Sequence, residues 1–406
     1  MKYVFVYMIF CSVHFFGLYY LFGSFMNGLI DTSYYIICFL FLGKFFFDKK
    51  TYKITKVNRF FTKPIVFLYI TLVFSAISCF YYHGQNPLKT LLGMRYFSYF
   101  MIYFMLISFG VQKKDIIKLL HVAAVIYMLV FLTQVYLYPT QIVPFDSSAS
   151  ISRGFLRLRL EGVGFVTLLG FYSLNKFLIN PKRKISIVLF LLCFTFVFIL
   201  GFRTLLLTYL FSAGLLVLLH NMTIVNVLKL IFVTAISFLL LWQLPIVKDF
   251  VIDAIVQTLE QSEEGDEYIR LLAFNFLFID VNVNFGSLFF GNGFPIRGTS
   301  YGNLVLVKGA DVNGYISADL GLIGFVFNYG LLSLFALLNV FRIAIFKNKS
   351  KESIYVGVFF VYLVVSSIST SEVYRIGMFG VEMIALYLFS LHSFEAEQEN
   401  IEIADI

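Results

Sequence analysis

Charged side chains are scarce in this sequence. Of its 406 residues only 13% are Asp, Glu, Lys or Arg, whereas 60% are hydrophobic. A soluble domain contains about a quarter charged residues. So few charges could not cover a surface that faces water. The composition therefore excludes a soluble globular fold and predicts an integral membrane protein.

Recognised catalytic and nucleotide-binding motifs are also missing. The sequence has no Walker A motif, no GxGxxG, no HExxH and no GxSxG. Its His and Asp residues show no metal-ligand spacing, so we expect neither a metal nor another cofactor. The net charge of +8 comes from basic residues dispersed between apolar runs. Without a continuous basic stripe, nucleic-acid binding is not expected.

Cysteine is rare as well, and its positions indicate no special chemistry. The four cysteines lie inside apolar stretches and show no CxxC spacing, so we interpret them as small hydrophobic residues. Neither a disulfide nor a zinc site is predicted. They are Cys11, Cys38, Cys79 and Cys193.

Twelve apolar runs follow one another along the chain, most of them long enough to cross a bilayer as a helix. They predict an all-α, polytopic membrane protein with about 12 transmembrane helices. Residues 1–406 form a single membrane domain, interrupted by one long loop at 245–320. The first run has no small-residue cleavage site and is expected to be retained as a span. The predicted spans are 3–22, 30–47, 64–82, 91–111, 119–138, 162–179, 185–200, 204–220, 228–244, 321–341, 354–371 and 375–392.

The basic residues predict the orientation of these spans. With a cytoplasmic N-terminus, 20 of the 31 basic residues fall in short loops on the inner side, as the positive-inside rule requires. Both termini are then cytoplasmic, and the 245–320 loop is periplasmic. We expect a multi-pass protein of the bacterial inner membrane.

The two sides also differ in the kind of basic residue. Seventeen of the 20 inner residues are Lys, whereas eight of the 11 outer residues are Arg. Arg presents a planar fork of donors that grips phosphate or carboxylate bidentately. The outer face is therefore predicted to bind an anionic group, and the alternative is ion pairing with outer acidic residues. The outer arginines are Arg95, Arg153, Arg157, Arg159, Arg203, Arg270, Arg297 and Arg375.

Three of these arginines come within seven residues at the end of segment 139–161. They are Arg153, Arg157 and Arg159, and a span follows directly. If the segment is helical, Arg153 and Arg157 share one face at spacing i, i+4. A plain solvated linker would more often use Lys, Ser and Glu, so this segment is predicted to bind ligand.

The 245–320 loop is predicted to contain two helices. Apolar residues between Phe250 and Leu259 recur at helical spacing, which indicates an amphipathic helix at the membrane surface. A second helix is predicted from Tyr268 to Ile279 and carries Arg270. The glycines and proline of FFGNGFPIRG (289–298) mark turns. A loop of this length is usually a lid or a binding element.

Charged residues also lie at and inside the start of the last span. Glu372 and Arg375 are three residues apart, and Glu382 lies about two turns deeper on the same face. A carboxylate inside a span costs about 2.5–3.5 kcal/mol. Glu382 is therefore expected to pair with an arginine such as Arg375, Arg203 or Arg95. These charges serve either as scaffold ion pairs or as ligand contacts.

Among the five histidines, only His83 has a position that suits catalysis. It follows the third predicted span on the outer side. The other histidines lie mostly at span ends, where capping at the interface is the simpler interpretation.

Five stretches carry a resemblance to a known family. They are LLGMRYFSYFMIYF (91–104), RLRLEG (157–162), LGFRTLLLTYLFSAGLLVLL (200–219), FFGNGF (289–294) and DVNGYISADLGLIGFVFNYGLL (311–332). Together they resemble the O-antigen polymerase (Wzy-type) family, within the wider O-antigen ligase and polymerase group, over roughly 64–392. Ligase-like members carry a His-Asn pair where this chain has Ala310 and Asp311. That departure favours a polymerase.

The resemblance implies a glycosyltransferase that polymerises oligosaccharide repeat units. A growing glycan would pass from undecaprenyl pyrophosphate to the sugar of another lipid-linked unit, in O-antigen, capsule or exopolysaccharide synthesis. Membrane lipid and a chain-length regulator protein are the further partners expected. Charge on the leaving pyrophosphate requires fixed donors, and the acceptor hydroxyl requires a base.

These demands select the candidate residues. Asp311 is the leading candidate for the base, with Asp319 and Glu161 next. The expected substrate-binding residues are Arg95, Arg153, Arg157, Arg203, Arg270 and Arg375.

Three other functions stay open: a ligase of the same fold, a polysaccharide transporter or flippase, and a non-catalytic assembly subunit. A transporter would be expected to show internal repeats and broken helices at mid-membrane depth. No repeat relates the two halves of the sequence, which disfavours transport.

Overall fold

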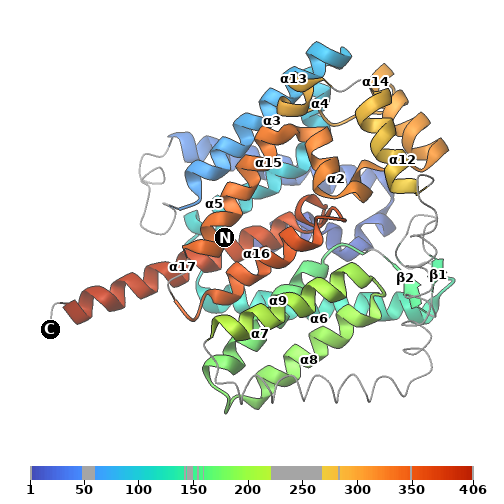
Figure 1. Ribbon diagram of the computed structural model, residues 1–406. Coiled ribbons are helices and arrows are strands. Elements are labelled where there is room, and N and C mark those ends of the chain that lie inside the picture. The colour runs from blue at the N-terminus through green and yellow to red at the C-terminus, as the bar shows by residue number, and fades with distance from the viewer. Residues whose placement is uncertain are drawn as a thin grey trace.

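The computed structural model describes residues 2–47, 60–140, 143, 150–152, 155–158, 160–220, 268–281, 284–347 and 350–404. In these ranges the chain is almost entirely helical, as predicted (Figure 1). The strands described are β1 (Ser150–Ser152) and β2 (Phe155–Arg157), which pair antiparallel.

The helices follow the apolar runs closely. In the first half they are α1 (Lys2–Ser12), η1 (His14–Phe22), α2 (Gly23–Phe47), α3 (Thr62–His83), α4 (Pro87–Gly93), η2 (Arg95–Phe100), α5 (Met101–Ser108), α6 (Lys113–Leu137), α7 (Val163–Ile179), α8 (Lys184–Ile199) and α9 (Arg203–Leu219). In the second half they are α12 (Ile269–Asn275), η4 (Phe276–Asp280), α13 (Phe285–Phe290), α14 (Ser300–Gly302), η5 (Asn303–Val312), η6 (Ser317–Leu320), α15 (Leu322–Phe346), α16 (Ile354–Ser366), η7 (Glu372–Tyr374) and α17 (Phe379–Ala404).

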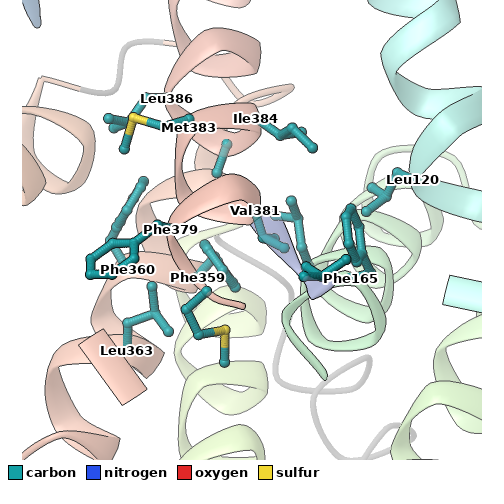
Figure 2. Packing of buried hydrophobic residues seen from close by; sticks show 14 of the residues in the cluster. Leu120, Phe165, Phe359, Phe360, Leu363, Phe379, Val381, Met383, Ile384 and Leu386 are labelled. Carbon is teal, nitrogen blue, oxygen red and sulfur yellow. The ribbon is translucent and has the colours of Figure 1, made fainter. Parts of the chain in front are cut away.

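Two groups of helices meet around α16 and α17 (Figure 1). One group contains α6, α7, α8 and α9, and the other contains α3, α13 and α15. Every residue of α17 from Phe379 to Phe389 is buried, as expected for a helix that is apolar on all sides. Figure 2 shows the core where α16 and α17 meet α6 and α7. Its labelled side chains are Leu120, Phe165, Phe359, Phe360, Leu363, Phe379, Val381, Met383, Ile384 and Leu386.

Among the described residues, three helices are long and apolar enough to cross a membrane, namely α3, α6 and α15, and the bent pair of α4 with η2–α5 gives a fourth. On α3, Ile70, Phe74 and Ile77 are exposed at helical spacing, which suits a lipid-facing stripe. Helices lie at each predicted span within the described ranges. Because α7, α8, α9 and α16 are shorter, the count of twelve spans stays a prediction. The predicted span 228–244 lies outside the described residues.

Two of the predicted spans in the first half of the chain are not continuous helices. The predicted span 3–22 breaks after Ser12, where His14, Phe15 and Phe16 have positive φ angles of 43°, 49° and 59°. The predicted span 91–111 is bent by 59° at the junction before Arg95. Apolar composition alone does not reveal either break, since every residue at both junctions suits a membrane helix or its end.

A third break, at Gly330 in α15, fixes the glycine-rich segment. Gly330 has φ 87° and ψ 162°, and a side chain there would lie 2.4 Å from the Phe290 backbone. The break frees the carbonyls of Phe327 and Asn328, which accept hydrogen bonds from the backbone amides of Asn292 (3.0 Å) and Gly293 (2.8 Å). The predicted turns in 289–298 are thereby confirmed. Their irregular backbone is buried within protein, as membrane depth requires.

The described part of the 245–320 loop is a packed helical layer. The predicted helix at 268–279 is confirmed as α12 continued by η4. Phe276 and Leu277 pack with Tyr301 and Val305 in a small core of their own. The predicted amphipathic helix at 250–259 lies outside the described residues.

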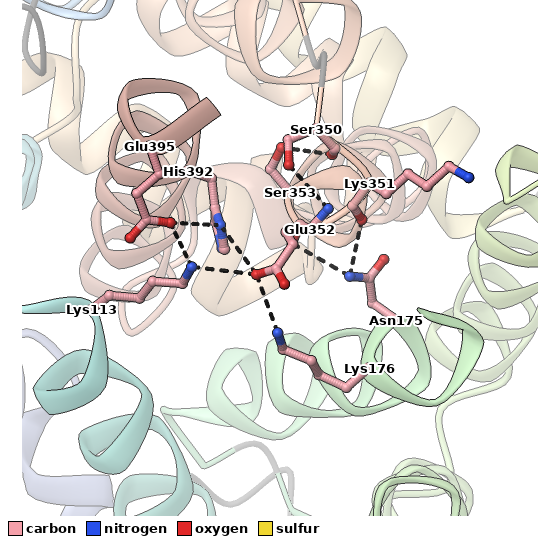
Figure 3. A network of polar contacts seen from close by, with 9 residues as sticks. All are labelled: Lys113, Asn175, Lys176, Ser350, Lys351, Glu352, Ser353, His392 and Glu395. Carbon is pink, nitrogen blue, oxygen red and sulfur yellow. Dashed lines mark hydrogen bonds and ion pairs between the residues drawn. The ribbon is translucent and has the colours of Figure 1, made fainter. Parts of the chain in front are cut away.

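Charged residues at one end of the bundle tie four elements together (Figure 3). Glu352, before α16, accepts from Lys113 at 3.3 Å and from Lys176 at 3.2 Å. Lys113 also donates to Glu395 of α17 at 2.7 Å. Lys113 and Lys176, which lie at the inner ends of two predicted spans, meet at Glu352, and the Lys351 carbonyl accepts from Asn175, so residues predicted to lie on the inner side come together at this end.

We predict that this charged end faces the cytoplasm. Reporter fusions after residues 116, 181 and 348 should report a cytoplasmic location, because the basic loops determine orientation. A fusion after residue 265 should report the periplasm. A cytoplasmic result at residue 265 would contradict the orientation.

The same end predicts a dependence of stability on pH. Burial would raise the pKa of Glu352, but the charges of Lys176 and Lys113 prevail and hold it below the ordinary 4.5. Because the pKa of Glu352 is lower in the folded state, its ion pairs with the two lysines stabilise the fold at pH values above the ordinary pKa. This contribution is lost as the pH falls through the lowered pKa.

Thermal unfolding between pH 7 and pH 3 tests this dependence, because the contribution is lost only as the pH falls below the ordinary pKa of 4.5. As the pH falls, the thermal midpoint of the wild type should decrease more steeply than that of Glu352→Gln. Near pH 7 the two proteins should differ in free energy of unfolding by about 1 kcal/mol at most, because Glu352 is partly exposed. Parallel curves would show that Glu352 does not contribute.

Candidate functional site

A buried carboxylate and imidazole form the centre of the candidate site. Glu161 precedes α7, and its Oε2 lies 2.7 Å from Nδ1 of His14. The side chains of His14 and Glu161 are only 5% and 17% exposed. Gly377 fits directly against Glu161, since a Cβ at Gly377 would lie 2.8 Å from the Glu161 Cβ. The pair is therefore enclosed by protein and largely shielded from bulk water.

The break in the first predicted span is what places His14 beside Glu161. Three successive non-glycine residues in the left-handed region are strained, and strain of this kind concentrates at functional sites. The turn is held by Phe16, whose ring packs edge-on against Tyr127 (5.9 Å) and Phe165 (6.1 Å). Tertiary packing therefore overrides the local backbone preference.

Arg375 lies on another side of Glu161. Its side chain is 16% exposed, and its Nη1 donates to Oε1 of Glu372 at 3.2 Å. The charges of Glu161 and Arg375 also act on one another. The segment that carries Glu372 and Arg375 is fixed, because Tyr374 Oη donates to the Gly321 carbonyl at 3.0 Å. Arg375 is thus a cation that is paired with Glu372 and close enough to Glu161 for their charges to interact.

Arg95 and Tyr96 continue this polar region to the surface. Arg95 is exposed, lies 4.7 Å from the centre of the Tyr96 ring and donates to its hydroxyl at 3.0 Å. The Tyr96 ring meets the His14 ring edge-on at 6.0 Å. Asp31 of α2 interacts electrostatically with Arg95, Tyr96 and His14.

These residues form one group, which we call the His14–Glu161 cluster. It comes from η1, α2, η2, the segment before α7 and the segment before α17. Its members are His14, Asp31, Arg95, Tyr96, Glu161, Glu372 and Arg375.

The cluster is recessed along the bundle. Tyr127 Oη of α6 lies 3.5 Å from the carbonyl of Leu160, next to Glu161. Ten residues of α6 separate Tyr127 from the helix end at Leu137, which is about 15 Å at 1.5 Å per residue. Fourteen residues, about 21 Å, separate it from the charged end at Lys113. The acid–base pair therefore lies between apolar helices at an intermediate depth.

The structure brings together three of the predicted site residues: Glu161, Arg95 and Arg375. Asp311, the leading candidate for the base, lies elsewhere. Arg297 donates to both its carboxylate oxygens, at 2.6 and 2.9 Å, and thereby lowers the pKa of Asp311. Asp311 lies in the last turn of η5 and caps neither η6, whose N-cap is Ile316, nor α15, whose N-cap is Gly321.

Most other predicted residues are separate from the cluster. Asp319 lies in η6, where it interacts electrostatically with Tyr374, next to Arg375. Arg203 begins α9, and Arg270 lies in α12. The helical arrangement considered for Arg153 and Arg157 is wrong, because Arg157 pairs with Ser150 in the hairpin. Arg153 and Arg159 lie outside the described residues.

The expected ion pair of Glu382 is not formed. Both its carboxylate oxygens are buried, and neither has a hydrogen-bond partner in the described part of the chain. Arg375 pairs with Glu372 instead. Position on a common helix face was a poor guide here, because Arg375 precedes α17 in extended backbone and does not continue the helix.

His14, and not His83, is the histidine that lies in the candidate site. His83 is hydrogen-bonded to Asn292 at 2.7 Å and stacked on Tyr301 at 4.2 Å, so it joins α3 to the glycine-rich segment. His14 was not singled out, because it lies within an apolar run. A polar residue inside such a run is the signal that could have found it.

Comparisons of this chain with protein-family models, with curated proteins and with solved structures find no match. Among the described residues, no group of three His, Cys, Asp or Glu side chains could hold a metal ion. The cluster and the resemblance of the five sequence stretches are therefore what indicate a function.

Proposed function

We propose that this chain is a glycosyltransferase of the bacterial inner membrane that polymerises undecaprenyl-pyrophosphate-linked oligosaccharide repeat units. The supporting observation is the enclosed His14–Glu161 pair beside two arginines. An acid–base group and fixed cations, recessed among apolar helices, suit a substrate with a hydroxyl, a pyrophosphate and a lipid tail.

Glu161 is the base in this proposal. The acceptor hydroxyl oxygen bonds to the anomeric carbon of the donor glycan, and the bond from that carbon to the pyrophosphate oxygen breaks. The leaving pyrophosphate takes the electron pair, and the hydroxyl proton passes to Glu161. His14 at 2.7 Å orients the carboxylate and shares the proton. General base catalysis of this kind typically contributes about 10²–10⁴-fold.

The arginines stabilise the leaving group. A guanidinium carries five N–H donors, and the ion pair of Arg375 with Glu372 uses Nη1. Its other donors suit the oxygens on which charge develops, without reorganisation during the reaction. Arg95, exposed at the bend before η2, suits the pyrophosphate at the edge of the protein, where the lipid tail must leave.

This assignment changes the leading base from Asp311 to Glu161. The bidentate pair with Arg297 makes Asp311 a weaker base, and its side chain is 42% exposed. A solvent-exposed carboxylate that is already paired with an arginine has little tendency to accept a proton. Arg203 and Arg270 stay candidates for contacts with the glycan.

Deletion of the gene tests the function, with the length of surface glycan as the measurement. Loss of a polymerase leaves single repeat units attached. Loss of a ligase leaves no attached glycan, and loss of a flippase strands repeat units inside the cell. The broken helices at His14, Arg95 and Gly330 are also a feature of transporters. Stranded repeat units would therefore contradict the proposal and favour transport.

A further inference from the structure

A cavity lies at the charged end of the bundle, away from the His14–Glu161 cluster and beside the network in Figure 3. Its volume is about 740 Å³, within the range of roughly 300–1,000 Å³ that is typical of ligand sites. It is formed by the end of α5, the start of α6 and one side of α17. The lining residues are Ile107, Gly110, Val111, Gln112, Lys113, Lys114, Ile117, Tyr387, Leu391 and Glu395.

The cavity combines an apolar wall with a basic rim. Ile107, Ile117 and Leu391 are among the apolar residues that line it. On the rim, the charge of Lys113 is matched by Glu352 and Glu395. Lys114 is exposed, and no ion pair joins it to another residue in the described part of the chain. The rim therefore has a positive charge available to a ligand.

We propose that this cavity binds an anionic phospholipid, with the headgroup phosphate at Lys114 and an acyl chain along Ile107, Ile117 and Leu391. Basic pockets between helix ends are suited to acidic lipid headgroups. A free phosphate would use the lysine but not the apolar wall, which is why the lining favours a lipid. The inference rests on placement in a membrane and not on glycosyl transfer.

Lipid binding here affects the packing of helix ends. Lys113 faces the same cavity and holds Glu395 of α17 at 2.7 Å. A lipid between α5, α6 and α17 therefore contacts the elements that this network joins. Binding to the folded state alone raises the temperature of unfolding.

The test measures thermal unfolding of the full chain in phosphatidylcholine nanodiscs that contain increasing fractions of phosphatidylglycerol. The variant is Lys114→Gln, and the matched control is Lys118→Gln. Both lysines are exposed on α6 one turn apart, but only Lys114 lines the cavity. Ile117→Trp, which fills the apolar wall without changing charge, tests the acyl-chain contact separately. Inorganic phosphate and glycerol phosphate are added in parallel.

Phosphatidylglycerol should raise the midpoint of the wild type and of Lys118→Gln. Lys114→Gln should need about fivefold more of it for the same shift, since a basic residue near a membrane surface contributes on this scale. Ile117→Trp should weaken the response as well. Equal responses of Lys114→Gln and Lys118→Gln would overturn the proposal. A rise with inorganic phosphate as large as that with phosphatidylglycerol would overturn the lipid assignment.

Discussion

Glu161→Gln is expected to reduce polymer synthesis by at least about 100-fold while the protein accumulates normally in the membrane. The amide keeps the size of the carboxylate and its contact with His14, but it cannot take the proton of the acceptor hydroxyl. General acid–base groups typically contribute about 10²–10⁴-fold. The measurement is the length distribution of surface glycan at matched protein level.

The control for this experiment is Glu395→Gln, an equivalent change at the opposite end of the bundle, where Glu395 is 48% exposed. Its glycan should keep normal length. Asp311→Asn provides the decisive comparison, because sequence analysis alone favours Asp311. Loss of polymer in Asp311→Asn together with normal polymer in Glu161→Gln would return the base to Asp311 and refute the role of the cluster.

Arg375→Ala is expected to lower stability by about 3–5 kcal/mol, the usual cost of removing one partner from a buried ion pair. Its partner Glu372 is only 3% exposed, so its carboxylate would be left buried without the arginine that neutralises it. The measurements are the thermal midpoint of the purified protein and its level in the membrane.

A matched control is Arg297→Ala, whose pair with Asp311 is 63% and 42% exposed. Solvent replaces that interaction, so only a small change is expected. Adding Glu372→Gln to Arg375→Ala should recover part of the loss, because it removes the unpaired charge. Similar losses of stability in Arg375→Ala and Arg297→Ala, with no recovery of stability in the double variant, would contradict the prediction. They would show that burial of the Arg375–Glu372 pair does not determine its contribution to stability.

The helices were predictable from sequence because a lipid solvent leaves a strong apolar signal. Apolar runs located α3 to within two residues at both ends, and α6 to within six residues at its start and one at its end. The turns around Gly291 and Gly293 were also predictable, since glycine readily adopts the positive φ angles that such turns require. These features depend on local composition.

The breaks in the helices could not be predicted, because distant contacts determine them. The turn at His14 is held by Tyr127 and Phe165, which lie more than a hundred residues away. The break at Gly330 is completed by amides from the glycine-rich segment. A window along the sequence contains none of these partners.

The candidate site was predictable only in part, for the same reason. Arg95, Arg375 and Glu161 were identified by residue type and by their position at span ends. Their meeting depends on the fold, as does the pairing of Glu161 with His14. Asp311 was favoured by position, yet Arg297, fourteen residues earlier, changes its chemistry.

The left-handed turn at His14–Phe16 implies a conflict between stability and activity. Each non-glycine residue in this region costs about 1–2 kcal/mol, so the turn costs roughly 3–6 kcal/mol. That is a large part of the net stability of about 5–15 kcal/mol of a typical protein. Selection for heat resistance alone would therefore favour glycine at Phe15 or a straightened first helix. In this protein the most thermally stable variant and the most active variant would therefore have different residues at this turn.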